Sequence, residues 1–168
     1  LGAADVTGRV AILDADQIAP STNARVQLVL DQPIGAVTCD RFIIRDQSAQ
    51  RTIGGGYVVD IFPPTRGRAR PERLAMLNAL DTGDNEQALS GALVAAPTGL
   101  DLQRFAVARN LTSDELAAVI VPSGAVVVGP AGSRLAYTTA AWQSLRNDTL
   151  AALDRYHVQH TDRLGPSV

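Results

Sequence analysis

The segment that most constrains the fold is residues 41–60, RFIIRDQSAQRTIGGGYVVD. Strand-forming residues stand on both sides of a polar turn, Asp46-Gln47-Ser48, so the segment predicts a β-hairpin. We expect the second strand to run over residues 51–61, interrupted by the three glycines at 54–56. Glycines inside a strand indicate either a bulge or a close approach by another molecule. No helix follows them, so they do not resemble a dinucleotide fingerprint, and a bulge is favoured over a ligand site.

The remainder of the first 62 residues is also predicted to be β-rich. Residues 8–13 and 25–30 are short strand-forming runs on either side of a loop that contains Pro20 and Ser21. With the hairpin, these runs predict that the first 62 residues form a β domain.

The composition changes after this β domain. Residues 63–70 contain two prolines and a glycine, and they form a predicted linker. Leucines recur at helical spacing from about Pro71 to Leu80, and these residues predict a helix over 71–80. Pro71 suits the first turn of this helix. Asp84-Asn85 is expected to cap a second helix that ends near Ala96.

Residues 100–120 predict a helix, a short turn and another helix. Asp101 is expected to cap the first helix, and Thr112 with Glu115 forms a capping box for the second, which should end near Ile120. Two β-rich runs, 125–128 and 134–137, follow around a glycine- and proline-containing turn. A helix-turn-helix followed by a hairpin is typical of a winged helix, which we predict over residues 71–138.

A long amphipathic helix is predicted from Thr139 to about His160. It carries His157 and His160, which are three residues apart and are potential ligands for one metal ion. No cysteine or nearby carboxylate pair completes a tetrahedral site, so packing or solvation of the histidines is favoured.

Composition excludes several classes of protein. All 15 cationic residues are arginine, so the lysines that a phosphate-binding loop and a guanine-specific pocket require are absent, and the chain is not a complete GTPase. The net charge of −2 provides no general attraction to nucleic acids or membranes.

Cys39 is the only cysteine, which excludes an internal disulfide and fits a reducing cytoplasm. We expect no enzymatic activity, no cofactor, no metal and no membrane segment in this chain.

The β-rich segments resemble the C-terminal β-barrel of translation elongation factors. In that family a D-V-T-G turn, a strand ending in Pro-Ile, an R-F-x-x-R-[DE] strand and an R-T-[IV]-G-x-G strand follow one another. Here the corresponding segments begin at Asp5, Val26, Arg41 and Arg51. The DQSAxRTIGGG sequence is most similar to that of the selenocysteine-specific elongation factors, whose barrel precedes tandem winged-helix domains.

This resemblance implies a multi-domain α+β fold. An incomplete antiparallel β-barrel, residues 1–62, would lack its first strands, and the linker 63–70 would lead to a winged-helix domain, residues 71–138. Residues 139–168 would begin a second, truncated winged helix. An incomplete barrel has an open edge, so we expect self-association through it.

The resemblance also implies a function. The parent factor would be a GTPase, using GTP and Mg²⁺, that delivers selenocysteyl-tRNA to the ribosome at UGA codons. A selenocysteine-insertion hairpin in the mRNA would bind domains that this chain lacks. The chain would be a cytoplasmic fragment that contacts the tRNA backbone and forms a spacer arm, with no cofactor of its own.

Carried over to this sequence, the resemblance nominates Thr7, Asp46 and Gln47 as contacts to the T-stem backbone of tRNA. Arg45 and Arg51 flank the turn and could contact phosphate. For Arg51 the alternative is a cross-strand ion pair with Asp46. Tu-type factors have glycines after the acidic residue, and here Gln47 and Ser48 stand at those positions. Their side chains either reach further or obstruct a close approach of the backbone to RNA.

Four arginines, Arg66, Arg68, Arg70 and Arg73, crowd the linker and its exit. They predict either contact with RNA or a solvated linker, and a short basic cluster is a weak signal for RNA. The second helix of the helix-turn-helix, residues 113–120, contains two acidic residues and no cation. Acidic groups oppose binding to phosphates, so this helix is expected to be part of a spacer rather than a reader of nucleic acid.

Two other classes compete with this interpretation. A DNA-binding winged-helix transcription regulator with a β-rich sensor domain is opposed by the net charge and by the cation-free helix. A general elongation or initiation factor has a similar barrel, but the following winged helix disfavours it.

Overall fold

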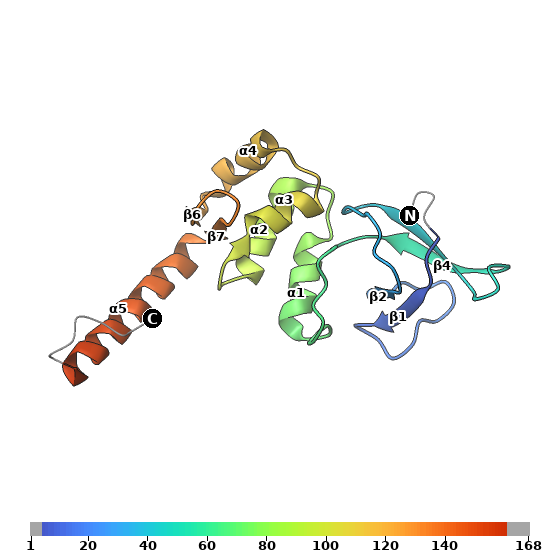
Figure 1. The fold of residues 1–168 in the computed structure, drawn as a ribbon, viewed down its shortest axis with the longest axis horizontal. Helices are drawn as coiled ribbons and strands as arrows, with labels where there is room; N and C mark the ends of the chain where they lie inside the picture. Colours follow the sequence, from blue (N-terminus) through green and yellow to red (C-terminus); the bar gives the residue numbers. More distant parts are fainter. Residues whose placement is uncertain (1–4, 161–168) are drawn as a thin grey trace.

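The computed structural model describes residues 5–160, which form a β-rich part followed by a helical part (Figure 1). In the view of Figure 1 the β-rich part lies at one end of the molecule and helix α5 extends at the other. In chain order the elements are β1 (Gly8–Ile12), β2 (Val26–Leu30), β3 (Arg41–Arg45), β4 (Thr52–Tyr57), α1 (Pro71–Leu80), α2 (Asn85–Ala95), β5 (Leu100–Asp101), α3 (Leu102–Ala108), α4 (Ser113–Ser123), β6 (Val126–Val128), β7 (Leu135–Tyr137) and α5 (Thr139–Gln159). The chain is therefore a mixed α+β protein.

The β-rich part contains two antiparallel pairs, β1–β2 and β3–β4. Gly8 lies opposite Leu30 and Ile12 lies opposite Val26. The backbone of β2 lies so close to Gly8 that no side chain fits there: a Cβ atom would stand 2.6 Å from the Val29 carbonyl oxygen. The antiparallel pairing expected from the sequence is confirmed.

The hairpin β3–β4 differs in detail from the prediction. The glycines at 54–56 lie within β4 and do not interrupt it, and the strand ends at Tyr57 rather than at residue 61. The bulge-like register shift falls at the turn end of the hairpin: Ile44 pairs with Gly54 and Arg45 pairs with Thr52. The absent side chain of Gly56 leaves room for the Phe42 ring, which a Cβ atom would approach to 3.0 Å.

Local capping determines where the helices begin. The Asp84 carboxylate accepts hydrogen bonds from the backbone of Glu86 and Gln87, and Asp101 accepts one from the backbone of Arg104. Thr112 and Glu115 form the predicted capping box. Helix α4 continues to Ser123, three residues beyond the predicted end, because the first left-handed residue is Gly124, with φ of 62°.

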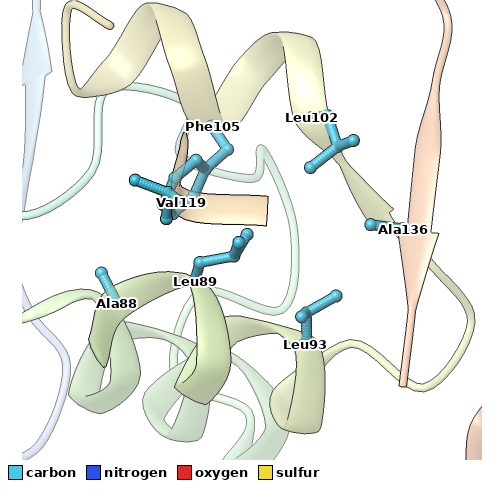
Figure 2. Close-up of a cluster of buried hydrophobic side chains, with 7 residues drawn as sticks. All are labelled: Ala88, Leu89, Leu93, Leu102, Phe105, Val119 and Ala136. Carbon is cyan, nitrogen blue, oxygen red and sulfur yellow. The ribbon is translucent and has the colours of Figure 1, made fainter. Parts of the chain in front are cut away.

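The largest core lies in the helical part, between α2, α3, α4 and the strand β7 (Figure 2). Figure 2 shows Leu89, Phe105 and Val119 pointing toward one another, with Leu93 and Leu102 on the side of Ala136. Strand β7 lies between β5 and β6 in a three-stranded antiparallel sheet. By contrast, Leu13 is the only buried hydrophobic residue of the described β-rich part. The helical part therefore holds most of the apolar burial.

Helix α5 forms as predicted, with the Thr138 hydroxyl accepting a hydrogen bond from the Ala141 backbone at 3.1 Å. None of its residues is buried. The His160 ring stacks on Tyr156 with centroids 4.4 Å apart. Residues 5–160 bring no three metal-ligating side chains together. The C-terminal end of the predicted segment 139–168 lies outside the described residues.

Within the described range, no helix combines the length and the apolar character needed to cross a lipid bilayer.

Candidate RNA-binding surface

The turn between β3 and β4 is organised by Asp46. One carboxylate oxygen of Asp46 accepts hydrogen bonds from the Ser48 hydroxyl at 2.9 Å, from the Gln50 amide at 3.1 Å and from the Arg51 amide at 3.3 Å. The backbone of Asp46 also donates to the Arg51 carbonyl, and Ala49 takes a left-handed φ of 55°. These bonds connect both ends of the turn to the Asp46 carboxylate.

The same hydrogen bonds stabilise the charged form of Asp46. The amide of Arg51 makes the largest contribution and the hydroxyl of Ser48 the next, and together they lower the pKa of the Asp46 carboxyl below its usual value. Asp46 therefore acts as a charged carboxylate, and one of its oxygens accepts all three of these hydrogen bonds.

The cations on either side of the turn are free to reach outward. Arg45 pairs with Thr52 at the end of the hairpin, and Arg45, Gln47 and Arg51 are all exposed. Within residues 5–160, Arg51 and Asp46 form no ion pair between their side chains. Instead, the backbone amide of Arg51 donates a hydrogen bond to the Asp46 carboxylate. Both guanidinium groups are therefore accessible to a phosphate backbone.

Thr7 lies beside the other sheet, just before β1. Its hydroxyl donates a 2.6 Å hydrogen bond to the Asp31 carboxylate, and its carbonyl accepts one from the Asp31 amide. A hydroxyl has one proton, so Thr7 has only acceptor capacity left for a ligand. That capacity suits a 2′-hydroxyl better than a phosphate. Within residues 5–160, the Thr7 hydroxyl bonds to Asp31 and not to the Asp46 turn.

The linker arginines separate into two kinds. Arg73, inside α1, forms a 2.6 Å ion pair with Asp60, and these side chains are only 15% and 10% exposed. Arg66, Arg68 and Arg70 form no ion pair within the described residues. Arg73 thus joins α1 to the end of the β-rich part, while Arg66 and Arg70 are exposed and Arg68 is half-buried.

Helix α4 presents no cation between its first and last residues. Glu115 is engaged by Thr112, whose backbone N–H and hydroxyl lower the pKa of the Glu115 carboxyl. The acidic first turn caps the helix, as the sequence indicates, and offers nothing to attract a phosphate.

Two polar residues that hold the structure together were missed by the sequence analysis. Asp81, between α1 and α2, binds Arg25 and Tyr57 of the β-rich part. Arg109, at the end of α3, is half-buried, and burial lowers the pKa of its guanidinium. Its partners are 24 or more positions away in the sequence, so no local pattern could have revealed its role.

The first 65 residues match a family model described as the beta-barrel domain of the selenocysteine-specific elongation factor. The β-rich part thus places the chain among translation elongation factors. Over 165 residues, or 98% of this chain, it is 36% identical to the selenocysteine-specific elongation factor of Escherichia coli (strain K12) and covers 25% of that protein. It is 26% identical over 166 residues to the protein of the same name from Haemophilus influenzae (strain ATCC 51907 / DSM 11121 / KW20 / Rd). That alignment covers 99% of this chain and 26% of that protein. The chain belongs to the family of selenocysteine-specific elongation factors.

The chain spans about a quarter of the length of the curated relatives it matches. The matches extend through both the β-rich and the helical parts, and they give no support to a DNA-binding transcription regulator.

Proposed function

We propose that this chain supplies the tRNA-contacting β-barrel segment and the spacer arm of a cytoplasmic selenocysteine-specific elongation factor. The observation that carries the proposal is the 36% identity to such a factor over 98% of the chain. In the proposal the whole factor is a GTPase, using GTP and Mg²⁺, that brings selenocysteyl-tRNA to the ribosome at UGA codons. This part contributes binding and geometry, with no chemistry or cofactor of its own.

The barrel contacts tRNA through the hairpin turn. Support comes from the exposed residues Arg45 and Arg51, which flank a turn whose backbone is hydrogen-bonded to Asp46. Gln47 and Thr7 add neutral polar groups, which suit sugar hydroxyls. Such contacts position RNA by its backbone and carry no sequence information.

The helical part is a winged-helix domain over residues 71–138, followed by the beginning of a second over residues 139–168. Support comes from the order α2, β5, α3, α4, β6, β7, with β7 between the other two strands. The cation-free α4 favours a spacer over a nucleic-acid reader. Beyond this chain, further domains of the factor would bind the selenocysteine-insertion mRNA hairpin.

A binding measurement tests the proposal. Fluorescence anisotropy of a labelled selenocysteine-tRNA transcript would be followed as the chain is added, at a series of salt concentrations. If only the two hairpin arginines neutralise phosphates, log K should fall against log salt with a slope of magnitude about 2, and with the three linker arginines the slope should be about 4. A random DNA duplex of equal charge is the control. Tighter binding to that duplex than to the tRNA would contradict the proposal and favour a DNA-binding regulator.

The exposed apolar residues of the β-rich part also support self-association of the isolated chain. Ile43 on β3 is 67% exposed and Ile53 on β4 is 61% exposed. We propose that the incomplete barrel pairs with a second copy through this hairpin.

A further inference from the structure

One of the contacts between the β-rich and helical parts is made by the loop between α1 and α2, which carries Asp81. One carboxylate oxygen of Asp81 accepts a 3.0 Å hydrogen bond from the Arg25 guanidinium, and the other accepts a 2.8 Å bond from the Tyr57 hydroxyl. Arg25 directly precedes β2, and Tyr57 ends β4. A single carboxylate thus joins both sheets of the β-rich part to the helical part.

This contact is more protected than an ordinary surface ion pair. The side chains of Arg25 and Asp81 are 25% and 24% exposed, so salt screens their attraction less than it would on an open surface. The hydrogen bond from Tyr57 to the Asp81 carboxylate raises the pKa of the Tyr57 hydroxyl, so this hydroxyl keeps its proton to a higher pH than an ordinary tyrosine does.

The loop that carries Asp81 is itself held in place by Arg109. The Arg109 guanidinium donates to the Asn85 side chain at 2.7 Å and to the carbonyl oxygens of Leu80 and Thr82, on either side of Asp81. Arg109 also lies over the Phe105 ring, 5.7 Å from its centroid, next to the core of the helical part. The position of Asp81 is therefore fixed relative to the helical core.

Other contacts hold the two parts together without Asp81. Arg73 pairs with Asp60, the Thr38 amide donates to the Ala108 carbonyl at 2.7 Å, and Arg104 lies 5.4 Å from the centre of the Phe62 ring. Around Asp81, however, the parts are not closely packed: a cleft of about 280 Å³ is lined by Cys39, Tyr57, Leu80, Asp81 and Gly83, among others. Polar contacts rather than packing therefore span this side of the junction.

We infer that Asp81 is a positioning residue that sets the angle between the β-rich part and the helical arm. The inference rests on the proposed function, in which the first part binds tRNA and the second leads toward the mRNA-binding domains. Helix α5 alone, with 21 residues, is about 30 Å long. A tilt of about 10° at the junction would move the far end of such a helix by about 5 Å. A small change at Asp81 is thus amplified along the arm.

Double electron–electron resonance between two spin labels measures this angle directly. The labels would be placed by Gln50→Cys at the hairpin turn and Asp154→Cys near the end of α5, in a Cys39→Ser background. We expect Asp81→Ala to shift or broaden the distance distribution by about 5 Å or more, as a tilt of about 10° requires. Arg25→Gln and Tyr57→Phe, which each remove one partner of Asp81, should produce smaller changes in the same direction.

The matched control is Asp16→Ala, which removes an exposed carboxylate from the β1–β2 loop. It should leave the distance distribution unchanged. Circular dichroism establishes that each variant is folded, and a purely structural role for Asp81 would lower the unfolding midpoint without changing the distance distribution of the folded protein. If Asp81→Ala does not fold, the Arg25→Gln/Tyr57→Phe double variant carries the test. A folded variant lacking the Asp81 contacts with an unchanged distribution would overturn the inference.

The outcome is separable from that of the proposed function. The distance measurement uses no RNA, so it can succeed even if the anisotropy titration detects no tRNA binding. Conversely, tRNA binding by the Asp81→Ala variant at unchanged affinity is expected, because Asp81 lies outside the hairpin turn.

Discussion

Asp46 and Arg51 close the β3–β4 turn with two hydrogen bonds: the Asp46 backbone amide donates to the Arg51 carbonyl at 2.9 Å, and the Arg51 backbone amide donates to the Asp46 side-chain carboxylate at 3.3 Å. The arginine is therefore held at a fixed point of the turn while its exposed guanidinium remains available. This arrangement separates the residue that shapes the turn from the residue that would meet a ligand.

Arg51→Ala is expected to weaken binding of the tRNA transcript by about 1–2 kcal/mol, because one charged phosphate contact is lost. Fluorescence anisotropy would show this as a roughly 5–30-fold increase in Kd. Arg155→Ala removes an exposed arginine from α5, far along the chain from the hairpin, and should bind like the parent chain. Equal affinities for the Arg51→Ala variant and the parent chain would make Arg51 a structural residue.

The linker arginines should contribute to the salt dependence if they contact phosphates. Replacing Arg66, Arg68 and Arg70 together by glutamine should then reduce the magnitude of the salt slope by about 2–3, since each phosphate contact releases counterions. The measurement is the same titration repeated at each salt concentration. An unchanged slope would show that these arginines serve the solubility of the linker and not RNA binding.

The order of the hairpin turn should depend on pH through Asp46. The folded pKa of Asp46 is lowered, so its stabilising effect is complete above the unfolded value of about 3.8 and is lost as the pH falls through the lower folded value. NMR titration should show the Gln50 and Arg51 amide signals moving together below pH 3.8. The movement should vanish in Asp46→Asn. A transition centred above the usual value would contradict the hydrogen-bonding arrangement.

Leu89→Ala should destabilise the helical part by about 2–5 kcal/mol, because Leu89 is fully buried among α2, α3 and α4 and a cavity would remain. Urea unfolding followed by circular dichroism measures the loss. Leu150→Ala on α5 is the matched control: Leu150 is 49% exposed, so a change of less than about 1 kcal/mol is expected. Similar losses in both variants would show that the core lies elsewhere.

Light scattering at high micromolar concentration should detect a dimer of the isolated chain. Ile43→Arg places a charge on the exposed hairpin face and should restore the monomer mass. Val94→Arg, at a 74% exposed position on α2, is the control and should leave the dimer intact. A monomer mass for the unchanged chain would refute self-association.

Features that depend on neighbouring residues were accessible from the sequence. The caps at Asp84, Asp101 and Thr112 form as predicted, because each side chain bonds to a backbone N–H two or three residues away. The hairpin position was also predicted, since strand-forming runs and turn residues have local preferences. The glycines of β4 were misjudged as an interruption: a glycine weakens a strand locally, but pairing with β3 and the ring of Phe42 maintain it.

Features that join distant residues arose from the packing of the whole chain. Arg66 and Arg73 have the same chemistry and stand seven positions apart, yet only Arg73 meets a carboxylate, because α1 brings it to Asp60. Arg25 and Asp81 are 56 positions apart. Which charges are paired across the junction and which remain exposed thus depends on where folding of the whole chain places residues that are far apart in the sequence, and no short sequence pattern records this.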